Sequence, residues 1–335
     1  MKAFSENLVA EVDEVLGPVI SHAEEFSPSF HGYCGHLLER KNLRTYVRYI
    51  LDLLSLAQVD VEGKKVLDAG CGFATQDVVL ALLGAEEVHG VEIRSDWVRA
   101  CSYYLGGLKS KLNITVSEGD VAHLDHPSGF FDLILSNEAI SHYRDLSGFL
   151  EEAHRILKVG GKVVVSDGNN AANPLRARET RRVWRRFEEG PPPVSHGYTT
   201  TPYRVQRLEI IRAKLPNEEA SNLELFSRGT FGMNQQEVEE ACDRYVKEGV
   251  VPDNFWNGKD CPTDPRLNMV HERLFNPKDL VKRMDELGFE AKQYGYFGGA
   301  TGNKILRFAN GILSKASSVT ILVAPAFRIV AVKKS

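Results

Sequence analysis

The apolar residues near the N-terminus recur every three or four positions, which is the period of a helix with one buried face. The first such series is Leu8, Val12, Val15, Leu16 and Val19. A second helix is predicted over 38–56, and the glycine- and aromatic-rich stretch between them, 27–35, is predicted to be a loop. We therefore expect residues 1–60 to form an N-terminal helical cover.

From Lys64 onward the pattern changes, because short apolar runs now alternate with segments of helical period. Strands are predicted at 65–68, 87–91, 114–117, 131–136 and 162–166, with helices between them. Alternation of this kind favours a parallel sheet with helices on both faces. The fold class that we expect for residues 61–170 is therefore α/β, with a doubly wound and mostly parallel sheet.

The alternation stops near Asp167. Residues 171–274 instead hold several polar helices, one of them rich in arginine, and a break at Pro191-Pro-Pro193. The strand and helix pattern returns over 275–335 with a helix that ends at Gly288 and two apolar strands. We interpret 171–274 as a largely helical insertion that serves as a substrate cap, because the α/β core by itself offers a cofactor site and little else.

The strongest chemical signal is the turn Asp68-Ala-Gly70-Cys-Gly72 after the first predicted strand. A glycine turn between a strand and a helix lets a ligand approach outward-pointing backbone amides. Asp68 argues against a dinucleotide, whose pyrophosphate a carboxylate would repel. Ala74 and Thr75 also stand where that fingerprint has its third glycine. A ligand with a cationic amino group fits this turn better.

Two further acids follow the next two strands. Glu92 ends the second strand and could accept hydrogen bonds from both hydroxyls of a ribose, while Asp120 follows the third strand and could accept from an adenine amino group. Each acid taken alone could be a solvated strand end. Three acids at successive strand ends predict a nucleoside site, because ligands bind at the carboxyl ends of parallel strands.

These features together resemble class I S-adenosylmethionine-dependent methyltransferases with a Rossmann-like core. The resemblance rests on D-A-G-C-G, the acid after the second strand, G-D after the third, F-D-L-I-L-S-N-E and L-K-V-G-G-K. It covers 61–167 and resumes over 275–335. It implies S-adenosylmethionine as cofactor and S-adenosylhomocysteine as product. The cofactor contacts that it implies are Asp68, Gly70, Cys71, Gly72, Gln76, Glu92, Ile93, Asp120, Val121 and Asn137, with Asn137 bordering the methyl group.

The acceptor is less well defined. Ser136-Asn137-Glu138-Ala139 lacks the Asn-Pro-Pro-Tyr pattern of base-modifying relatives and the paired glutamates of protein arginine methyltransferases. The sequence therefore resembles the small-molecule and lipid-precursor branch more closely, with methyl transfer to an oxygen, nitrogen or carbon atom. Two alternatives stay open: a methyltransferase that acts on RNA or protein, and a catalytically silent protein that binds the cofactor as a regulator.

Three side chains are candidates for catalysis. His142 is the first candidate for a general base, and His31 and Tyr33 could close over the active site; packing is the alternative for all three. The candidate acceptor contacts are His196, Tyr198 and Asn169. No metal is expected, although Asp167, Asn169 and Asn170 with Glu138 leave a metal-assisted mechanism as an alternative.

Composition narrows the setting. The net charge of −4 argues against a general nucleic-acid-binding protein. Five cysteines without a C-x-x-C spacing argue against a disulfide framework or a zinc site and favour the cytoplasm. The N-terminus lacks the features of a secretory signal, and no apolar run is long enough to span a bilayer.

Two basic amphipathic segments bear on possible partners, namely 176–186 and 304–315. The first could bind a phosphate, an acidic substrate or an anionic membrane surface, and the second could contact a membrane. The alternatives are a solvated helix for the first and docking onto the sheet or onto a second subunit for the other. A small-molecule or lipid-linked acceptor is the expected partner, and a homodimer and peripheral membrane contact stay open.

Overall fold

The computed structural model describes residues 4–107, 112–191, 201–298, 305, 308, 312–313 and 320–335. The chain divides into two compact units. Unit 1 consists of Met1–Ile140, Asp145–Asn173 and Phe275–Ser335, and unit 2 consists of Ser141–Arg144 and Pro174–Leu274. The insertion predicted over 171–274 overlaps unit 2.

The N-terminal part of unit 1 is helical. Its elements are α1 (Glu6–Ser21), α2 (Ala23–Phe26), α3 (Pro28–Cys34), the 3₁₀ turn η1 (Gly35–Leu38) and α4 (Arg40–Ala57). The loop predicted over 27–35 is wrong, because α3 occupies most of it. Ser27 caps this helix by accepting a hydrogen bond from the Phe30 N–H at 3.3 Å, and Pro28 stands in the first turn. These start signals outweigh the glycine and aromatic content of the stretch.

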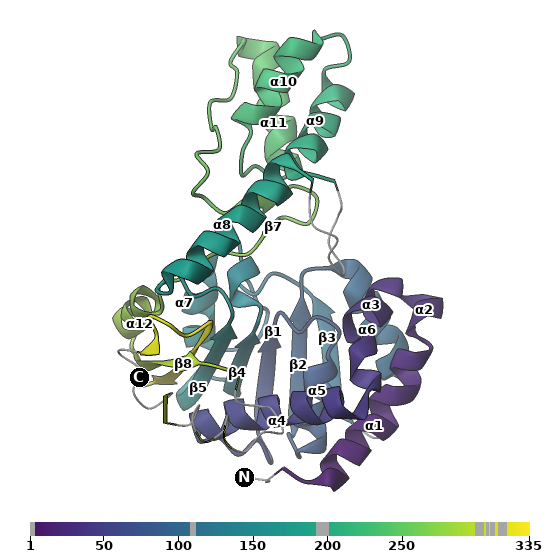
Figure 1. Ribbon diagram of the computed structural model, residues 1–335, viewed down its shortest axis with the longest axis vertical. Coiled ribbons are helices and arrows are strands. Elements are labelled where there is room, and N and C mark those ends of the chain that lie inside the picture. The colour runs from purple at the N-terminus through teal and green to yellow at the C-terminus, as the bar shows by residue number, and fades with distance from the viewer. Residues whose placement is uncertain are drawn as a thin grey trace. The chain divides into compact units, whose positions relative to one another are not determined.

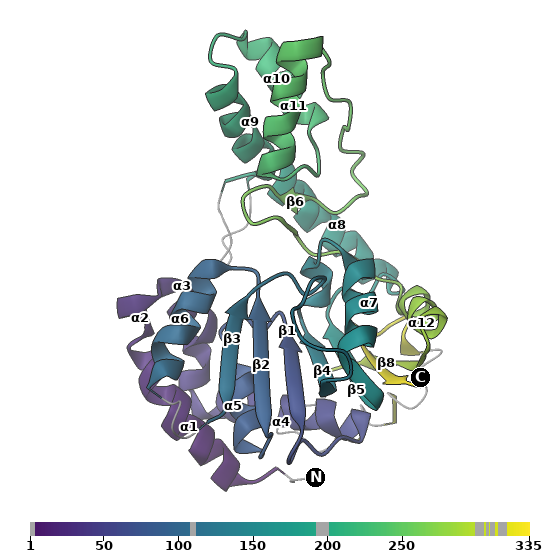
Figure 2. The same ribbon diagram turned by 180° about the vertical axis from the view of Figure 1, so that it is seen from behind.

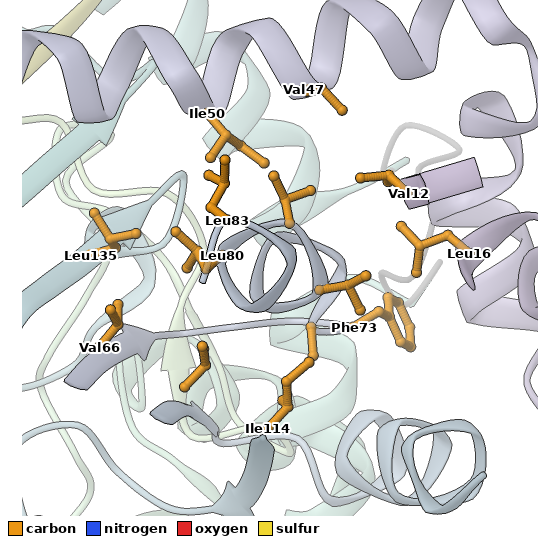
Figure 3. Packing of buried hydrophobic residues seen from close by; sticks show 14 of the residues in the cluster. Val12, Leu16, Val47, Ile50, Val66, Phe73, Leu80, Leu83, Ile114 and Leu135 are labelled. Carbon is orange, nitrogen blue, oxygen red and sulfur yellow. The ribbon is translucent and has the colours of Figure 1, made fainter. Parts of the chain in front are cut away.

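Apolar faces of these helices pack on the helix that follows the first strand, α5 (Thr75–Leu82). Figure 3 shows Val12 and Leu16 of α1 and Val47 and Ile50 of α4 gathered around that helix, with Leu80 on its side nearer Leu135. All five side chains are 1% exposed or less. The spacing of three or four residues that predicts the two long helices therefore also defines their buried faces.

The centre of unit 1 is a seven-stranded sheet with the order β3-β2-β1-β4-β5-β9-β8. The strands are β1 (Lys65–Ala69), β2 (Glu87–Glu92), β3 (Ile114–Glu118), β4 (Phe131–Asn137), β5 (Leu157–Asp167), β8 (Phe289–Tyr296) and β9 (Ala326–Lys333). The first five are parallel, and β9 runs antiparallel to both of its neighbours. The predicted fold class, a doubly wound and mostly parallel α/β sheet, is confirmed. One boundary differs, since β5 starts at Leu157 instead of Lys162.

Helices cover both faces of this sheet (Figures 1 and 2). In Figure 1, α4 and α5 lie in front of the strands, and in Figure 2 α7 (Leu146–Ile156) lies in front of β4 and β5. Burial on both faces explains why Val66 and Leu67 of β1 are both fully buried although their side chains point to opposite sides. The strand order reverses between β1 and β4, and ligands of such sheets bind at this reversal.

Unit 2 has a core of its own. Its elements are α8 (Pro174–Glu189), α9 (Tyr203–Lys214), α10 (Ala220–Gly229), α11 (Gln235–Glu248) and the strand pair β6 (Thr263–Asp264) and β7 (Met269–Val270). Ile211, Phe226 and Val238 bring α9, α10 and α11 together in one buried cluster. Asn234 and Glu237 form a capping box at the start of α11, which satisfies the first amides of that helix.

Several predictions about the whole chain can be compared with these units. All five cysteines are free, and no disulfide framework was expected from their spacing. Within the part of the chain that the structure describes, no helix has both the length and the apolar character needed to cross a membrane. The basic segment 176–186 lies in α8, whose Trp184 and Phe187 are buried. Most of the segment 304–315 lies outside the described residues.

Candidate functional site

The turn from β1 into α5 has an unusual backbone. Gly70 and Gly72 have φ angles of 73° and 57°, and Ala74, the N-cap of α5, has a φ of 53°. Glycine enters this left-handed region without steric penalty, whereas Ala74 is held there by the surrounding structure. A Cβ added to Gly72 would lie 3.7 Å from the Trp97 ring, an ordinary contact, so the backbone angle is what requires glycine. The Gly70 and Cys71 N–H groups both donate to the Val91 carbonyl oxygen, at 2.9 and 3.1 Å, so hydrogen bonds connect the turn to β2.

The three predicted acids lie at one edge of the sheet. Asp68 is on β1, Glu92 ends β2, and Asp120 follows β3. The three strands are adjacent and parallel, so their carboxyl ends meet around the glycine turn. Asp68 is 2% exposed and Glu92 7% exposed, which is unusual for carboxylates. The structure thus brings together residues that are far apart in the sequence.

Glu92 connects its strand to the glycine turn. One carboxylate oxygen, Oε2, accepts a hydrogen bond from the Gly72 N–H at 3.1 Å, and Oε1 accepts one from the Arg94 N–H at 3.0 Å. Burial raises the pKa of Glu92, while backbone hydrogen bonds from Arg94, Gly72 and Ile93 oppose this rise. A carboxylate has about four acceptor positions, so Glu92 can still accept from a ribose hydroxyl. Ile93, the next predicted contact, is half-buried.

Asp120 occupies a tight turn after β3. Its Oδ1 accepts a hydrogen bond from the Ala122 N–H at 2.9 Å, a local turn that fixes the side chain. Val121, between them, is 6% exposed. A fixed carboxylate beside a buried apolar residue is suited to an adenine ring, which has an amino group to donate and a flat apolar face.

A chain of polar side chains runs under the carboxyl ends of β1 and β4. Asp68 is hydrogen-bonded to Gln76, and Gln76 Oε1 accepts from Asn137 Nδ2 at 3.1 Å. Asn137 Oδ1 accepts in turn from the hydroxyl of Tyr49 in α4 at 2.5 Å. The Tyr49 hydroxyl also lies 2.8 Å from Ser166 Oγ on β5. The side chain of Asn137 is therefore fixed from both of its ends.

Two members of this site were not predicted from the sequence. Tyr49 lies in an amphipathic helix, where an aromatic residue is typical of core packing. Asp77 lies in the first turn of α5, where an acidic residue is typical of a solvated helix start. Asp77 is nevertheless fully buried and lies close to Asp68. No local sequence signal distinguishes either residue from its ordinary counterpart.

Aromatic side chains line the approach to the glycine turn. Phe73 and Trp97 stack with their ring centroids 4.4 Å apart, and Tyr33 of α3 lies 5.3 Å from Trp97. Tyr33 is 41% exposed, so the helical cover contributes an accessible phenol beside the turn. His31 is placed differently, because its Nδ1 lies 3.3 Å from the carbonyl oxygen of Ile20 within the helical cover.

The other candidates are placed as follows. His142 ends the short 3₁₀ helix η2 (Ile140–His142), belongs to unit 2, and has its Nδ1 3.3 Å from the Val270 carbonyl oxygen. Asn169 follows β5 in unit 1 and is 4% exposed. Its backbone N–H donates to Asp167 Oδ1 at 2.8 Å. His196 and Tyr198 lie outside the described residues.

Glu138 and Asn170, two of the residues that could serve a metal-assisted mechanism, form hydrogen bonds within the protein. Glu138 Oε2 accepts a hydrogen bond from the Gly168 N–H at 3.1 Å. Asn170 Oδ1 accepts a hydrogen bond from the Ala172 N–H at 3.0 Å. Its Nδ2 donates to the carbonyl oxygens of Ile321 and Ala324. Among the residues placed by the structure, no three His, Cys, Asp or Glu side chains are grouped as metal ligands would be. The absence of a metal stays a prediction, and the metal-assisted mechanism stays the alternative to it.

Comparison with known proteins identifies a domain within unit 1. Residues 67–165 match the family model described as a methyltransferase domain. Phosphoethanolamine N-methyltransferase 3 of Arabidopsis thaliana is 30% identical over 31% of this chain and 21% of its own length. Fatty-acid O-methyltransferase of Mycolicibacterium smegmatis is 32% identical over 36% of this chain and 43% of its own. The chain spans less than half the length of each of these relatives.

Solved structures are similar at a lower level. An S-adenosylmethionine-dependent methyltransferase from Mesorhizobium loti is 16% identical and has a TM-score of 0.44, with 84% of this chain and 96% of that chain covered. The matched domain contains Asp68, Glu92, Asp120 and the glycine turn between β1 and α5. The resemblance predicted from these motifs is confirmed, and the chain carries a methyltransferase domain.

Proposed function

We propose that this protein transfers a methyl group from S-adenosylmethionine to an oxygen, nitrogen or carbon atom of a small-molecule or lipid-linked metabolite. The observation that supports this most directly is the gathering of Asp68, Glu92 and Asp120 around the glycine turn, where the strand order of the sheet reverses. The carboxylates follow one another in the order that an aminoacyl nucleoside requires.

The residues fit the cofactor by charge and by hydrogen-bonding capacity. Asp68 and the turn Gly70-Cys71-Gly72 would hold the methionine end, because a buried carboxylate attracts a cationic amino group and glycine lets a ligand approach the backbone closely. Glu92 and the neighbouring Ile93 would hold the ribose, and Asp120 with Val121 the adenine. Gln76 and Asn137, hydrogen-bonded to each other, would border the reacting end.

The cofactor supplies a methyl group that is already activated by the sulfonium. The task of the protein is then alignment of the acceptor with that group, which can contribute about 7–11 kcal/mol. Asn137 is suited to this task because Tyr49 and Gln76 fix both ends of its amide. We further propose that His142 takes the acceptor's proton as a general base, that Tyr33 and His31 belong to the cover over the site, and that unit 2 is the substrate cap.

The acceptor class rests on less direct support. The two relatives described above are named for phosphoethanolamine and for fatty acids, which favours a small or lipid-linked acceptor. His196, Tyr198 and Asn169 remain proposed acceptor contacts. The net charge of −4 is against a nucleic-acid substrate. A cytoplasmic location is part of the proposal and is supported by five free cysteines.

The test uses methyl-labelled S-adenosylmethionine, the purified protein and an extract of its source organism. The products are separated into water-soluble small molecules, lipids extracted by organic solvent, and precipitated macromolecules. Label in either of the first two fractions supports the proposal, provided that Glu92→Ala protein transfers much less. Label in the macromolecular fraction would favour RNA or protein as substrate instead. Cofactor binding without label in any fraction would favour a silent regulator.

A further inference from the structure

Asp68 and Asp77 form a buried pair of carboxyl groups beside the glycine turn. Asp77 is 0% exposed and Asp68 2% exposed, and the two carboxyl groups lie close enough to share a hydrogen bond if one of them carries a proton. Neither oxygen of Asp77 accepts a hydrogen bond from an N–H group or a hydroxyl in the described part of the chain. Two ionised carboxylates have acceptors only, so a hydrogen bond between them requires that one of them holds a proton.

The surroundings of the pair give no compensation for a second negative charge. The titratable groups that act on it are Glu92 from β2, Cys71 from the turn, Cys101 and Tyr104 from α6 (Ser95–Gly106), and Tyr46 from α4. Each of these side chains is either neutral or negative. Burying one carboxylate without a cation is already costly, and two in contact repel each other strongly.

The fit of the backbone keeps Asp77 in place. A Cβ added to Gly90 of β2 would lie 2.6 Å from Asp77 Oδ2 and 2.7 Å from Cys71 Sγ. Gly90 pairs with Asp68 in the register of β1 and β2. The absence of a side chain at Gly90 is therefore what makes room for the carboxyl group of Asp77 under the turn, where it can reach Asp68.

We propose that Asp77 is a positioning residue for the amino group of the cofactor: it keeps its proton and donates a hydrogen bond to Asp68, which carries the single negative charge of the pair. This inference rests on the proposed cofactor site. Asp68 then has two donors, Gln76 and Asp77, and offers its remaining acceptor positions to a cationic ligand. A protonated carboxyl group holds the ligand-binding carboxylate as an amide would, without adding charge.

The pair should impose a pH dependence on cofactor binding. Burial raises the pKa of Asp68 to about 6 and that of Asp77 well above its ordinary value, and the two groups titrate as one coupled system. Above the first ionisation of the pair, one negative charge faces the ligand. Below it the pair gains a second proton, and affinity for a cationic ligand should fall by up to ~10-fold per pH unit.

Two substitutions of Asp77 distinguish whether its side chain is protonated or ionised in the wild-type protein. Asp77→Asn keeps a neutral donor, so the dissociation constant for S-adenosylhomocysteine at pH 7.5 should stay within about threefold of the wild-type value. Asp77→Leu removes the donor and leaves Asp68 less well stabilised as an anion, so the affinity should fall about tenfold or more. Equal losses in the two variants would overturn the proposal, because they would mean that Asp77 contributes a negative charge.

Infrared spectroscopy tests the proton directly and without a ligand. The difference spectrum of the wild-type protein and Asp77→Asn at pH 7.5 should contain the C=O band of a protonated carboxyl group. Asp96→Asn is the matched control. Burial raises the pKa of Asp96, but the hydrogen bond and charge of the Arg94 guanidinium, with backbone hydrogen bonds, outweigh burial and lower it, so that difference spectrum should lack the band. A missing band for Asp77 overturns the proposal even if Asp77→Leu fails to fold.

Different results would overturn the proposed cofactor site and the proposed role of Asp77. A wild-type protein that binds neither S-adenosylhomocysteine nor S-adenosylmethionine overturns the proposed function and the positioning role with it. Wild-type binding that is unchanged from pH 7.5 to pH 5, or that accompanies a missing infrared band, overturns only the role of Asp77. Binding that weakens below pH 6, together with the band, supports both.

Discussion

Both units of this protein bury charged side chains, but they compensate the charges in opposite ways. In unit 2 the guanidinium of Arg207, which is 0% exposed, forms an ion pair with Glu188, which is 3% exposed. Nearby, the Tyr203 hydroxyl lies 3.1 Å from His271 Nδ1, and the His271 ring lies 3.7 Å from that of Phe187. In unit 1 the buried acids Asp68 and Glu92 have backbone, amide or carboxyl partners, and neither forms an ion pair with a described residue; the charge of Arg94, which is paired with Asp96, acts on Glu92 without an ion pair.

This difference separates a structural role from a functional one. A buried ion pair compensates its own charges, so it holds the parts of a fold together without a ligand. Buried carboxylates that lack a cation raise the energy of the free protein, and a positively charged ligand relieves part of that energy when it binds. We therefore propose that the Arg207–Glu188 pair serves the stability of unit 2 and that the acids of unit 1 serve ligand binding.

The largest effect that we expect concerns His142, which belongs to unit 2 although a role in chemistry is proposed for it. His142→Ala should lower kcat about 10²- to 10⁴-fold, the usual contribution of a general base, and should leave the affinity for S-adenosylhomocysteine unchanged. Turnover is measured with the acceptor found by label fractionation, and exposed His22→Ala is the control. If kcat is unchanged, His142 has a packing role instead of a catalytic one, and unit 2 has a purely structural role.

The fold of unit 1 was largely predictable because its signals are local. Apolar runs of strand length, helical spacing and the glycine turn each depend on residues close together in the sequence. The site was predictable wherever a strand end leads into it, as at Asp68, Glu92 and Asp120. It was not predictable where a helix contributes a side chain, as at Tyr49 and Asp77, because helical periodicity gives no sign of which side chain bonds to a distant strand.

Unit 2 was predictable as a set of helices and hardly at all as a site. Its buried Arg207–Glu188 ion pair and the Tyr203–His271 contact are formed by residues of α8, α9 and the segment after β7. No rule of spacing relates Glu188, Arg207 and His271. An arginine in a polar helix is also typical of a solvated face. The arginines of the basic segment in α8 were conspicuous in the sequence, whereas the fully buried Arg207 of α9 was not.

The second prediction tests whether the ion pair of unit 2 is structural. Arg207→Met should leave Glu188 as an uncompensated buried charge and destabilise unit 2 by about 3–5 kcal/mol. Hydrogen exchange measured separately for residues of α9 and of β1 should show faster exchange in α9 alone. S-adenosylhomocysteine should still bind, because the acids of unit 1 are intact.

A matched control and a rescue variant sharpen this prediction. Arg212→Met changes an exposed arginine of the same helix, and its effect should stay within about 0.5 kcal/mol. Adding Glu188→Leu to Arg207→Met removes the remaining charge and should restore most of the lost stability. If Arg207→Met is no less stable than Arg212→Met, the ion pair does not hold unit 2 together.

The smallest of the three effects concerns Glu92 in unit 1. Glu92→Ala removes a charged acceptor that could bind the ribose hydroxyls, and one hydrogen bond to a charged group is worth about 1.5–3 kcal/mol. The dissociation constant for S-adenosylhomocysteine, measured by calorimetry, should therefore rise about 10- to 150-fold. Loss of the Gly72 and Arg94 backbone contacts should add to this rise by loosening the glycine turn.

The control for Glu92 lies on the same strand. Glu87 is at the other end of β2, where Lys65 Nζ lies 2.5 Å from its Oε1, so Glu87→Ala removes an acid of the same sheet without touching the carboxyl edge. Its affinity for S-adenosylhomocysteine should match that of the wild-type protein. If the two variants bind equally well, Glu92 only fastens the turn to β2. The buried acids of unit 1 would then be as self-contained as the Arg207–Glu188 pair, and burial without a cation would no longer indicate a ligand.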